Sequence, residues 1–358
     1  MEGIKESIAA QAAANSFIGL WQIVNEVEGA QLQKGFVPHL WRWDVLKPLM
    51  GEVSKNITLQ DADRRVIIMS NPGARHKHHS TNTLYLSCSI YNAGELAPVH
   101  RHTSNASRFV LEGAGGFTTI EGEKCTMSRG DLIITPAGTW HDHGNEGDEP
   151  VIWVDVLDLP LVENLAVSEF EFEYFEKDDS GKETRKEYQR LTLPDNYSTM
   201  VYSSGGFLPT FINHERGRSA GSPMFVYRWS EAKAALNRMR HMKGSPYDGI
   251  ILEYVNPING KAVTTTTSFH VQLLRPGEAT QAHRHTSSSA YCCLEGHGRT
   301  YVGDTVLEWG PNDMFVIPNG APHRHENLSG TEDAYLYSVS DAPAMKHLNL
   351  YREEHVNP

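Results

Sequence analysis

The chain alternates short hydrophobic runs with turns that contain glycine, and this pattern occupies two separate stretches. Short strands at close spacing are typical of antiparallel sandwiches and barrels. The sequence therefore predicts a mainly all-β protein, with helical patterns expected at residues 6–28 and 230–243. The runs are SRFVLEG, GFTTIEG, DLIITPAG and VIWVDVLD in the first stretch, and AYCCLEG, RTYVGD, MFVIPNG and DAYLYSVSD in the second.

The two stretches are copies of one another. Residues 94–160, which begin GELAPVHRHTSNASRFVLEGAG, match residues 277–343, which begin GEATQAHRHTSSSAYCCLEGHG, at an offset of 183 residues. So wide a spacing indicates a duplicated domain, because the repeats of solenoids are about 20–50 residues long. We expect an N-terminal helical arm (1–62), a first barrel (63–165), a connecting segment with a helix (166–248), a second barrel (249–345) and a C-terminal tail (346–358).

Composition narrows the class of protein. The chain has 32 basic and 44 acidic side chains, for a net charge of −12, which argues against nucleic acid or an anionic membrane as partner. No segment approaches the run of about 18 apolar residues that a membrane span needs. The four cysteines show no C-x-x-C spacing, which fits free thiols in a reducing compartment. We therefore expect a cytoplasmic protein.

Histidine is abundant, and eight of the 18 histidines form four H-x-H pairs inside the two copies. Side chains alternate between the faces of a strand, so His100 and His102 point to the same side. His141 follows 39 residues later, behind a turn that can bring a neighbouring strand alongside. Three imidazoles with open coordination positions suit a transition metal that performs chemistry better than a closed structural site. The second copy offers a second candidate triad of His283, His285 and His323.

Three further side chains are expected near the first triad. If the strand continues beyond His102, Arg108 lies on the same face, where its guanidinium matches a carboxylate bidentately; an exposed arginine at a strand edge is the alternative. His143 shares the side of His141, and imidazole suits proton transfer, although a purely hydrogen-bonding role is open. Asp155 lies inside the apolar run VIWVDVL and needs a partner, whether its role is catalytic or structural.

The second copy lacks two of these groups. Tyr291 stands where the first copy has Arg108, and Ser338 where it has Asp155. The second cavity thus keeps a candidate metal triad without the groups that would hold an anionic aromatic acid. We expect catalysis in the first copy.

A separate histidine cluster occurs in the segment ARHKHHS. His76, His78 and His79 resemble metal ligands by composition. Their position in an expected loop favours a solvated cluster instead.

The motifs around the triads resemble the two cupin signatures. The first copy carries Gly94-x5-His100-x-His102 and then Gly130-x5-Pro136-x-Gly138-x2-His141-x3-Asn145, and the second copy repeats most of both. The chain is therefore similar to a bicupin, with two antiparallel β-barrel or jelly-roll domains. It departs from the general cupin pattern at Ala106 and Ser289, where a glutamate ligand is usual.

The segments DRRVIIMSNPG, HRHTSNASRF and WHDHGNEGDEPVIWVDVLDLP are similar to the gentisate 1,2-dioxygenase family, which includes salicylate and 1-hydroxy-2-naphthoate dioxygenases. The resemblance implies Fe(II) on His100, His102 and His141, with dioxygen as co-substrate. It also implies ring cleavage between the carbons that bear the carboxylate and the hydroxyl, which converts gentisate to maleylpyruvate. It favours a homotetramer.

The same resemblance assigns roles around the metal. It implies that Arg108 binds the substrate carboxylate and that Arg64 is a second cationic contact to the substrate. It also places Asp155 near the substrate and the histidines. Tyr85 falls where a wall of the substrate pocket is expected, although it could be a plain core aromatic. Small aromatic hydroxy acids are thus the expected partners.

Alternatives remain open at this point. Ser104, Asn105 and Ser107 depart from the usual gentisate pattern, so salicylate or 1-hydroxy-2-naphthoate could be the substrate. A manganese bicupin of the oxalate decarboxylase kind is disfavoured by the missing glutamates. A non-catalytic binding bicupin is disfavoured because it needs neither two histidine triads nor an inward arginine.

Overall fold

The structure is a computed structural model that describes residues 2–27, 35–59, 64–172, 175–185, 191–215 and 220–356. The chain divides into two units, Met1–Lys34 and Gly35–Pro358. The first unit contains α1 (Glu2–Ala14) and α2 (Leu20–Val27), so the expectation of one continuous helix over 6–28 was wrong. The helices are separated at Ser16, whose φ of 60° is left-handed and ends a right-handed helix.

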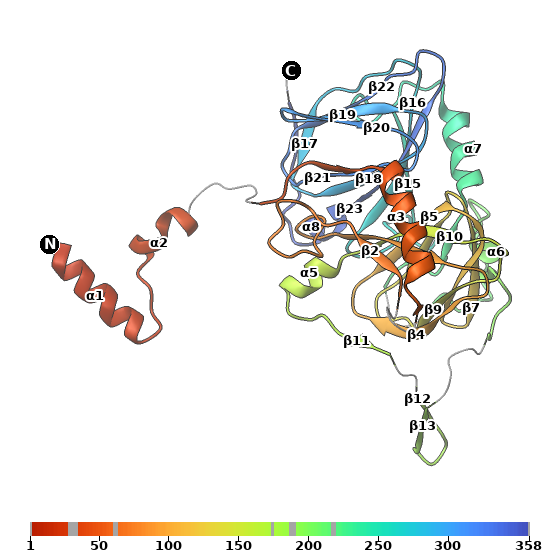
Figure 1. The fold of residues 1–358 in the computed structure, drawn as a ribbon, viewed down its shortest axis with the longest axis horizontal. Helices are drawn as coiled ribbons and strands as arrows, with labels where there is room; N and C mark the ends of the chain where they lie inside the picture. Colours follow the sequence, from red (N-terminus) through yellow and green to blue (C-terminus); the bar gives the residue numbers. More distant parts are fainter. Residues whose placement is uncertain are drawn as a thin grey trace. The chain divides into compact units, whose positions relative to one another are not determined.

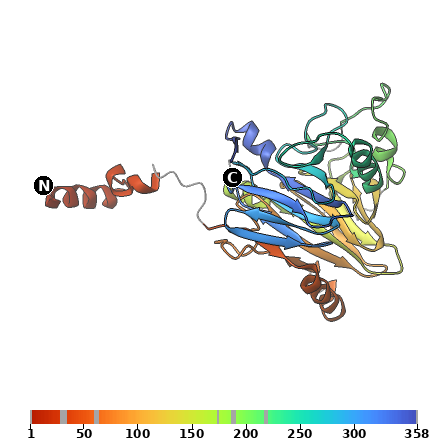
Figure 2. The same ribbon diagram turned by 90° about the horizontal axis from the view of Figure 1, so that it is seen from above.

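The second unit contains two similar antiparallel barrels, and the predicted all-β duplication is confirmed (Figures 1 and 2). The first barrel comprises β2 (Val66–Ile68), β3 (Tyr85–Tyr91), β4 (Leu96–His102), β5 (Ala106–Glu112), β6 (Ala114–Ile120), β7 (Glu123–Ser128), β8 (Leu132–Thr135), β9 (His141–Asn145) and β10 (Val151–Leu157). The second comprises β15 (Ile250–Tyr254), β16 (Ser268–Leu274), β17 (His283–His285), β18 (Ser289–Glu295), β19 (Gly298–Val302), β20 (Thr305–Trp309), β21 (Met314–Ile317), β22 (His323–Asn327) and β23 (Ala334–Ser340).

Segments outside the barrels form the remaining elements. They are β1 (His39–Trp41), α3 (Trp43–Asn56), α5 (Leu159–Asn164), β11 (Phe170–Glu171), β12 (Phe175–Lys177), β13 (Glu183–Arg185), α6 (Tyr197–Tyr202), β14 (Val226–Tyr227), α7 (Trp229–Met239), α8 (Ala342–His347) and β24 (Glu353–His355). The helix expected at 230–243 is thus α7. No helix in the described part of the chain is long and apolar enough to cross a membrane.

The sheets of the two barrels correspond strand for strand. The six-stranded sheet β14-β8-β5-β10-β3-β2 has the same order as β1-β21-β18-β23-β16-β15. The five-stranded sheet β11-β4-β9-β6-β7 likewise matches β24-β17-β22-β19-β20. The repeated unit therefore extends beyond the two copies visible in the sequence, and it includes edge strands from the N-terminal arm, the connecting segment and the C-terminal tail.

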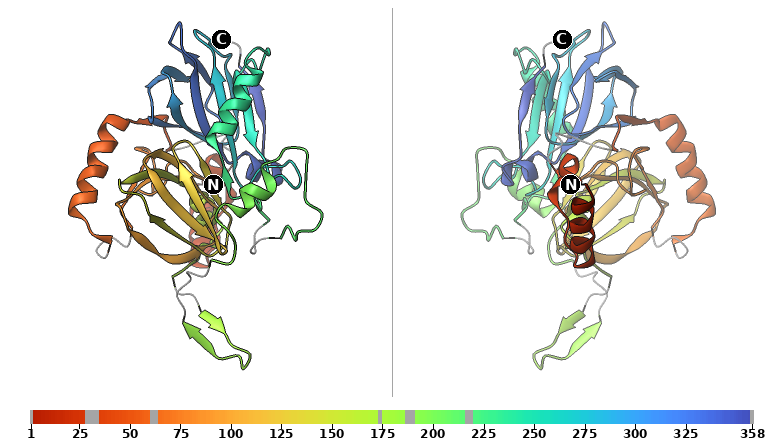
Figure 3. Two further views of the ribbon diagram at one scale, coloured as in Figure 1. Left: turned by 90° about the vertical axis from the view of Figure 1, so that its right-hand side faces the viewer. Right: turned by 90° about the vertical axis from the view of Figure 1, so that its left-hand side faces the viewer.

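The first edge strands are exchanged between the barrels. β1 precedes the first barrel in the chain but pairs with β21 of the second, whereas β14 precedes the second barrel and pairs with β8 of the first. The helix after each of these strands packs on the barrel that follows it in the chain. Helix α3 packs against β3 of the first barrel, and α7 packs against β15 and β16 of the second (Figure 3). The same contact fixes both junctions, because Arg42 and the amide of Trp43 bind Asp313, and Arg228 and the amide of Trp229 bind Asp131.

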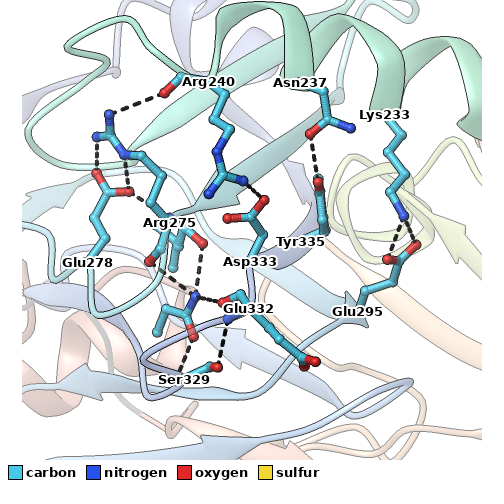
Figure 4. Close-up of polar contacts among 12 residues, drawn as sticks. Lys233, Asn237, Arg240, Arg275, Glu278, Glu295, Ser329, Glu332, Asp333 and Tyr335 are labelled. Atoms are coloured by element: carbon cyan, nitrogen blue, oxygen red, sulfur yellow. Dashed lines mark hydrogen bonds and ion pairs between the residues drawn. The ribbon is translucent and has the colours of Figure 1, made fainter.

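Helix α7 is held on the second barrel by polar side chains (Figure 4). The contacts are Lys233 to Glu295 at 2.6 Å, the hydroxyl of Tyr335 to Asn237 at 2.8 Å, and Arg240 to Asp333. These contacts keep the exchanged β14–α7 unit in place.

The barrels also contact one another through reciprocal polar pairs. Thr83 of the first barrel donates to Asp341 of the second at 2.6 Å, and Thr266 of the second donates to Asp158 of the first. Thr83 and Thr266 are 183 positions apart, and so are Asp158 and Asp341. Equivalent residues of the repeat therefore make equivalent contacts across the interface between the barrels. Buried residues from both barrels belong to one hydrophobic cluster.

Candidate metal centre and substrate cavity

The three histidines of the first predicted triad have neighbouring rings. His100 and His102 lie on β4, and His141 on β9 is the cross-strand neighbour of His100. The ring centroids lie 4.3, 4.9 and 5.8 Å apart. Each Nδ1–H donates to a backbone carbonyl, so each Nε2 is left with its lone pair; the carbonyls are those of Pro98, Ser104 and Thr139, at 3.0, 2.8 and 2.8 Å.

This donor set fits a metal ion. The Nε2 of His141 is buried without a hydrogen-bond partner, which is costly unless something else binds it. Burial lowers the pKa of His102 to about 4 and holds the pKa values of His100 and His141 well below their usual range, so the rings are neutral near pH 7. Neutral imidazole is the form that binds metals, and the carbonyl bonds fix the tautomer.

A neighbouring histidine competes for the third ligand position. The ligand atoms of His100, His141 and His143 all lie within 4.8 Å of one another, a set that contains His143 in place of His102. However, the Nε2 of His143 accepts from Arg108 at 2.9 Å, so its Nδ1–H donates to Thr118 at 3.1 Å. The short contact with Arg108 engages the Nε2 of His143, which favours His102, the residue expected from the sequence, as the third ligand.

Arg108 and Asp155 form a buried pair beside the triad. They are cross-strand neighbours on β5 and β10, with Nε 3.2 Å from the carboxylate, and Arg108 is 3% exposed. Arg108 also donates to Thr135 at 2.6 Å. Burial raises the pKa of Asp155 and lowers that of Arg108, and each charge opposes the shift of the other. Since Ser89 also donates to Asp155, at 2.5 Å, the carboxylate is well supported as an anion.

The route by which Arg108 reaches the cavity differs from the sequence expectation. The strand does not continue beyond His102, because β4 ends there and β5 begins at Ala106 in the other sheet. Arg108 nevertheless lines the cavity, because the two sheets face each other across it. The argument from alternation along one strand was wrong, although the placement was correct.

The pKa of His143 also differs from that of a free imidazole. Burial, and then the positive charge of Arg108, lower the pKa of His143 well below its usual value. His143 is therefore a neutral hydrogen-bond acceptor for Arg108, and it can move a proton only when that contact opens.

A cavity of about 470 Å³ is lined by most of the predicted site residues. Its polar lining includes Arg64, Tyr85, His102, Arg108, His143 and Asp155. Arg64 also donates to the Nε2 of His100 at 3.3 Å, so this cation lies beside one of the predicted ligands. Apolar and aromatic side chains complete the walls: Val66, Ile68, Tyr91, Trp153, Leu157, Leu159 and Phe170.

The connecting segment contributes two aromatic residues that sequence reasoning missed. Phe170 on β11 pairs with His102, with ring centroids 5.2 Å apart, and the ring of Phe172 lies 6.1 Å from His100. The alternation in the segment SEFEFEYF was the available signal, because residues two apart share one face of a strand.

The second barrel has a larger cavity, of about 660 Å³. The rings of its triad of His283, His285 and His323 lie 4.4, 5.0 and 5.5 Å apart, close to the first triad. Tyr291 and Ser338 are cross-strand neighbours in the register that Arg108 and Asp155 occupy in the first barrel, and they line this cavity.

The loop histidines are only partly solvated. His76 is exposed, but His79 is 6% exposed and lies 2.9 Å from the carboxylate of Glu163 on α5. The expectation of a solvated cluster was therefore wrong for His79. His78 and Glu163 line the cavity of the first barrel, and neither their pairing nor their location could be read from the sequence.

Comparison with known proteins supports the same interpretation. The model of the cupin domain matches residues 89–157 and 270–340. The chain is 39% identical over 342 residues to 5-aminosalicylate 1,2-dioxygenase of Comamonas sp., covering 93% of this chain and 86% of that protein. It is 37% identical over 335 residues to gentisate 1,2 dioxygenase 1 of Aquipseudomonas alcaligenes, covering 93% and 91%.

A solved structure matches over nearly the full length. The salicylate 1,2-dioxygenase from Pseudoaminobacter salicylatoxidans, in its adduct with gentisate, superposes with a TM-score of 0.86 at 27% identity, covering 99% of this chain and 94% of that one.

Proposed function

The chain belongs to the gentisate 1,2-dioxygenase family of ring-cleaving cupin dioxygenases, and on this premise we propose that it cleaves gentisate between its carboxyl-bearing and hydroxyl-bearing carbons to give maleylpyruvate. The observation that carries the proposal is a group of buried histidines next to a buried arginine, at a cavity with aromatic walls that His102, His143 and Arg108 line.

Fe(II) would be held by the Nε2 atoms of His100, His102 and His141. When bound, iron with open coordination positions supplies a site for both the aromatic acid and dioxygen, and a path for electrons from the ring to oxygen. The protein contributes the ligand geometry and the neutral state of the three imidazoles, both of which follow from burial and the carbonyl bonds.

Arg108 would bind the substrate carboxylate. A guanidinium has five N–H donors, and the hydrogen bonds to Thr135 and His143 use two of them, while the Nε lies 3.2 Å from the Asp155 carboxylate as an ion pair. The remaining donors are available for a carboxylate, and Asp155 holds the group in position. Arg64 supplies a second positive charge, so the two cations favour an anionic aromatic acid over a neutral phenol.

His143 and the aromatic walls would complete the site. His143 would accept the phenolic proton when a bound substrate draws Arg108 away from its Nε2, and its Nδ1–H bond to Thr118 keeps the ring oriented. Tyr85, Trp153 and Phe170 restrict water and provide flat surfaces for a planar substrate.

The substituent para to the hydroxyl governs the choice of substrate. The para hydroxyl of gentisate donates electrons and makes the ring easier to oxidise, and an amino group does the same, as in the substrate that gives the Comamonas relative its name. Salicylate and 1-hydroxy-2-naphthoate lack this donor and are the alternative substrates.

Oxygen consumption by Fe(II)-loaded protein tests the proposal. We expect oxygen uptake with gentisate and no turnover of oxalate. The same assay with 5-aminosalicylate, salicylate and 1-hydroxy-2-naphthoate ranks the candidate substrates. Protein that holds iron but consumes no oxygen with any of the aromatic acids would contradict ring cleavage.

We propose further that the enzyme is a cytoplasmic homotetramer. All four cysteines are free and buried, which suits a reducing compartment. The tetramer is inferred from the family alone, and light scattering on a size-exclusion column measures it directly.

A further inference from the structure

A third group of imidazoles lies at the wall of the catalytic cavity, outside both barrel triads. It consists of His76, His78 and His79 in the loop before β3, with Glu163 on α5 facing them. The ligand atoms of His78, His79 and Glu163 lie within 4.8 Å of one another. The reaction described above has no use for these residues.

The geometry of this group resembles that of the triads. The ring centroids of His78 and His79, His76 and His79, and His76 and His78 lie 4.4, 5.0 and 6.0 Å apart. The corresponding distances in the first barrel are 4.3, 4.9 and 5.8 Å. The loop therefore brings its imidazoles as close together as the backbone of a barrel does.

Glu163 supplies the anionic ligand that both barrel triads lack. The Nε2 atoms of His78 and His79 both lie 2.9 Å from the same oxygen, Oε2. In the absence of an ion, these contacts are two N–H donors on one carboxylate. A metal ion can replace the two protons, provided that each ring moves its hydrogen to Nδ1.

We propose that His78, His79 and Glu163 bind a divalent transition metal of the Zn²⁺ type, with the fourth position open to His76. Two imidazoles and a carboxylate are ordinary Zn²⁺ ligands, and Zn²⁺ prefers four-coordinate tetrahedral sites. The ion would link the loop to α5 and lie on the wall of the catalytic cavity, which His78 and Glu163 line. The site goes beyond ring cleavage, because its occupancy requires no aromatic substrate.

Zn²⁺ uptake by the full-length Fe(II)-loaded protein tests this site. We expect equilibrium dialysis with metal analysis to find one more Zn²⁺ per chain in the wild type than in Glu163→Gln, whose amide keeps the size of the side chain but is a poor ligand. The dissociation constant of this ion should rise more than about 100-fold, beyond the loss typical of an outer-sphere partner.

Two matched variants make the result specific. His241→Ala removes an exposed histidine and should leave uptake unchanged. Uptake that falls in His323→Ala but not in Glu163→Gln would assign the ion to the second barrel and overturn the proposal.

Anomalous diffraction at the zinc edge provides a measurement that does not depend on variants. We expect a peak between the Nε2 atoms of His78 and His79 in crystals soaked with Zn²⁺. Crystals without a peak there would leave Glu163 as a hydrogen-bonded link between loop and helix, and would overturn the metal site.

Discussion

The two barrels have the same strand order and nearly the same histidine triad, but different side chains around it. Arg108 and Asp155 form a cross-strand charged pair in the first barrel, and Tyr291 and Ser338 occupy the same register in the second. The spacing of the imidazole rings is nevertheless almost unchanged. The barrel backbone thus sets the metal-binding geometry, while a few substitutions decide whether an aromatic acid can be held next to it.

The strands that cover the triads show the same contrast. β11 places Phe170 opposite His102, whereas β24 places Glu353 opposite His285. Phe170 and Glu353 lie 183 positions apart, so they are equivalent in the repeat. The carboxylate of Glu353 lies 3.2 Å from the Nδ1 of His283. An aromatic side chain therefore covers the first triad, and a carboxylate covers the second. The negative charge of this carboxylate would repel an anionic substrate.

The largest expected effect separates the two triads. His141→Ala should abolish ring cleavage and remove iron from the first site, because it deletes one of three ligands. His323→Ala, at the equivalent position, should leave ring cleavage within a few-fold of the wild type. Metal analysis and oxygen uptake on the same preparations measure both effects. Equal losses of turnover in the two variants would show that the barrels act together.

The second prediction moves the side chains of the second barrel into the first. The double variant Arg108→Tyr with Asp155→Ser should retain iron, since the triad is untouched, but lose about 10²–10⁴-fold in kcat/KM, the range expected when a buried charged contact is removed. Steady-state kinetics and metal analysis test the two parts separately.

The stability of a single variant shows whether the loss of turnover in the double variant comes from unfolding. Arg108→Ala leaves Asp155 buried without its cation, and should lower the free energy of unfolding by about 3–5 kcal/mol. The double variant should be closer to the wild type, because the second barrel accommodates tyrosine and serine in this register. Urea unfolding measures the difference. Loss of iron from the stable double variant would mean that the pair supports the metal centre itself.

Much of the fold could be predicted from the sequence, because the repeat and the alternation of hydrophobic residues are local signals. The exchange of β1 and β14 could not, since β1 pairs with a strand more than 270 positions away. A weak signal existed, because an Arg-Trp pair stands at the start of both α3 and α7, at Arg42–Trp43 and Arg228–Trp229. Its meaning depends on Asp313 and Asp131, which only the folded chain brings near.

The site was predictable where residues sit close together in sequence. His100 and His102 are two apart on one strand, and His143 follows His141 on another. The contact of Arg108 with His143 could not be inferred, because it joins two sheets. Burial also lowered the pKa of His143, an effect of the whole environment that no motif contains.

The third prediction concerns the contact between the barrels. Burial raises the pKa of Asp341 to about 7, so the folded protein retains a proton that the unfolded chain releases near pH 4. This proton stabilises the fold at low pH, and the free energy of unfolding should fall as pH rises from about 4 to about 7, by at most about 4 kcal/mol.

Asp341→Asn tests this contribution, because the amide stays neutral. Urea unfolding at pH 5 and pH 8 should show a smaller loss of stability in the variant than in the wild type. Asp304→Asn, in the exposed turn between β19 and β20, is the control and should behave like the wild type. Identical pH slopes in all three proteins would place the proton elsewhere.

The smallest expected effect concerns the covering strands. Phe170→Glu places the carboxylate of the second barrel beside the first triad, and should raise KM for gentisate about tenfold, or about 1.4 kcal/mol, with less change in kcat. Phe170 is 39% exposed, so the added charge is partly screened by solvent. The rise in KM should therefore shrink as ionic strength rises from 0.01 to 0.15 M, since the Debye length falls from about 30 to about 8 Å.

Phe170→Leu removes the ring without adding charge, and its KM should not depend on salt. The same salt response in both variants would mean that Phe170 acts by packing alone, and that the charge of Glu353 is not what excludes the substrate from the second barrel.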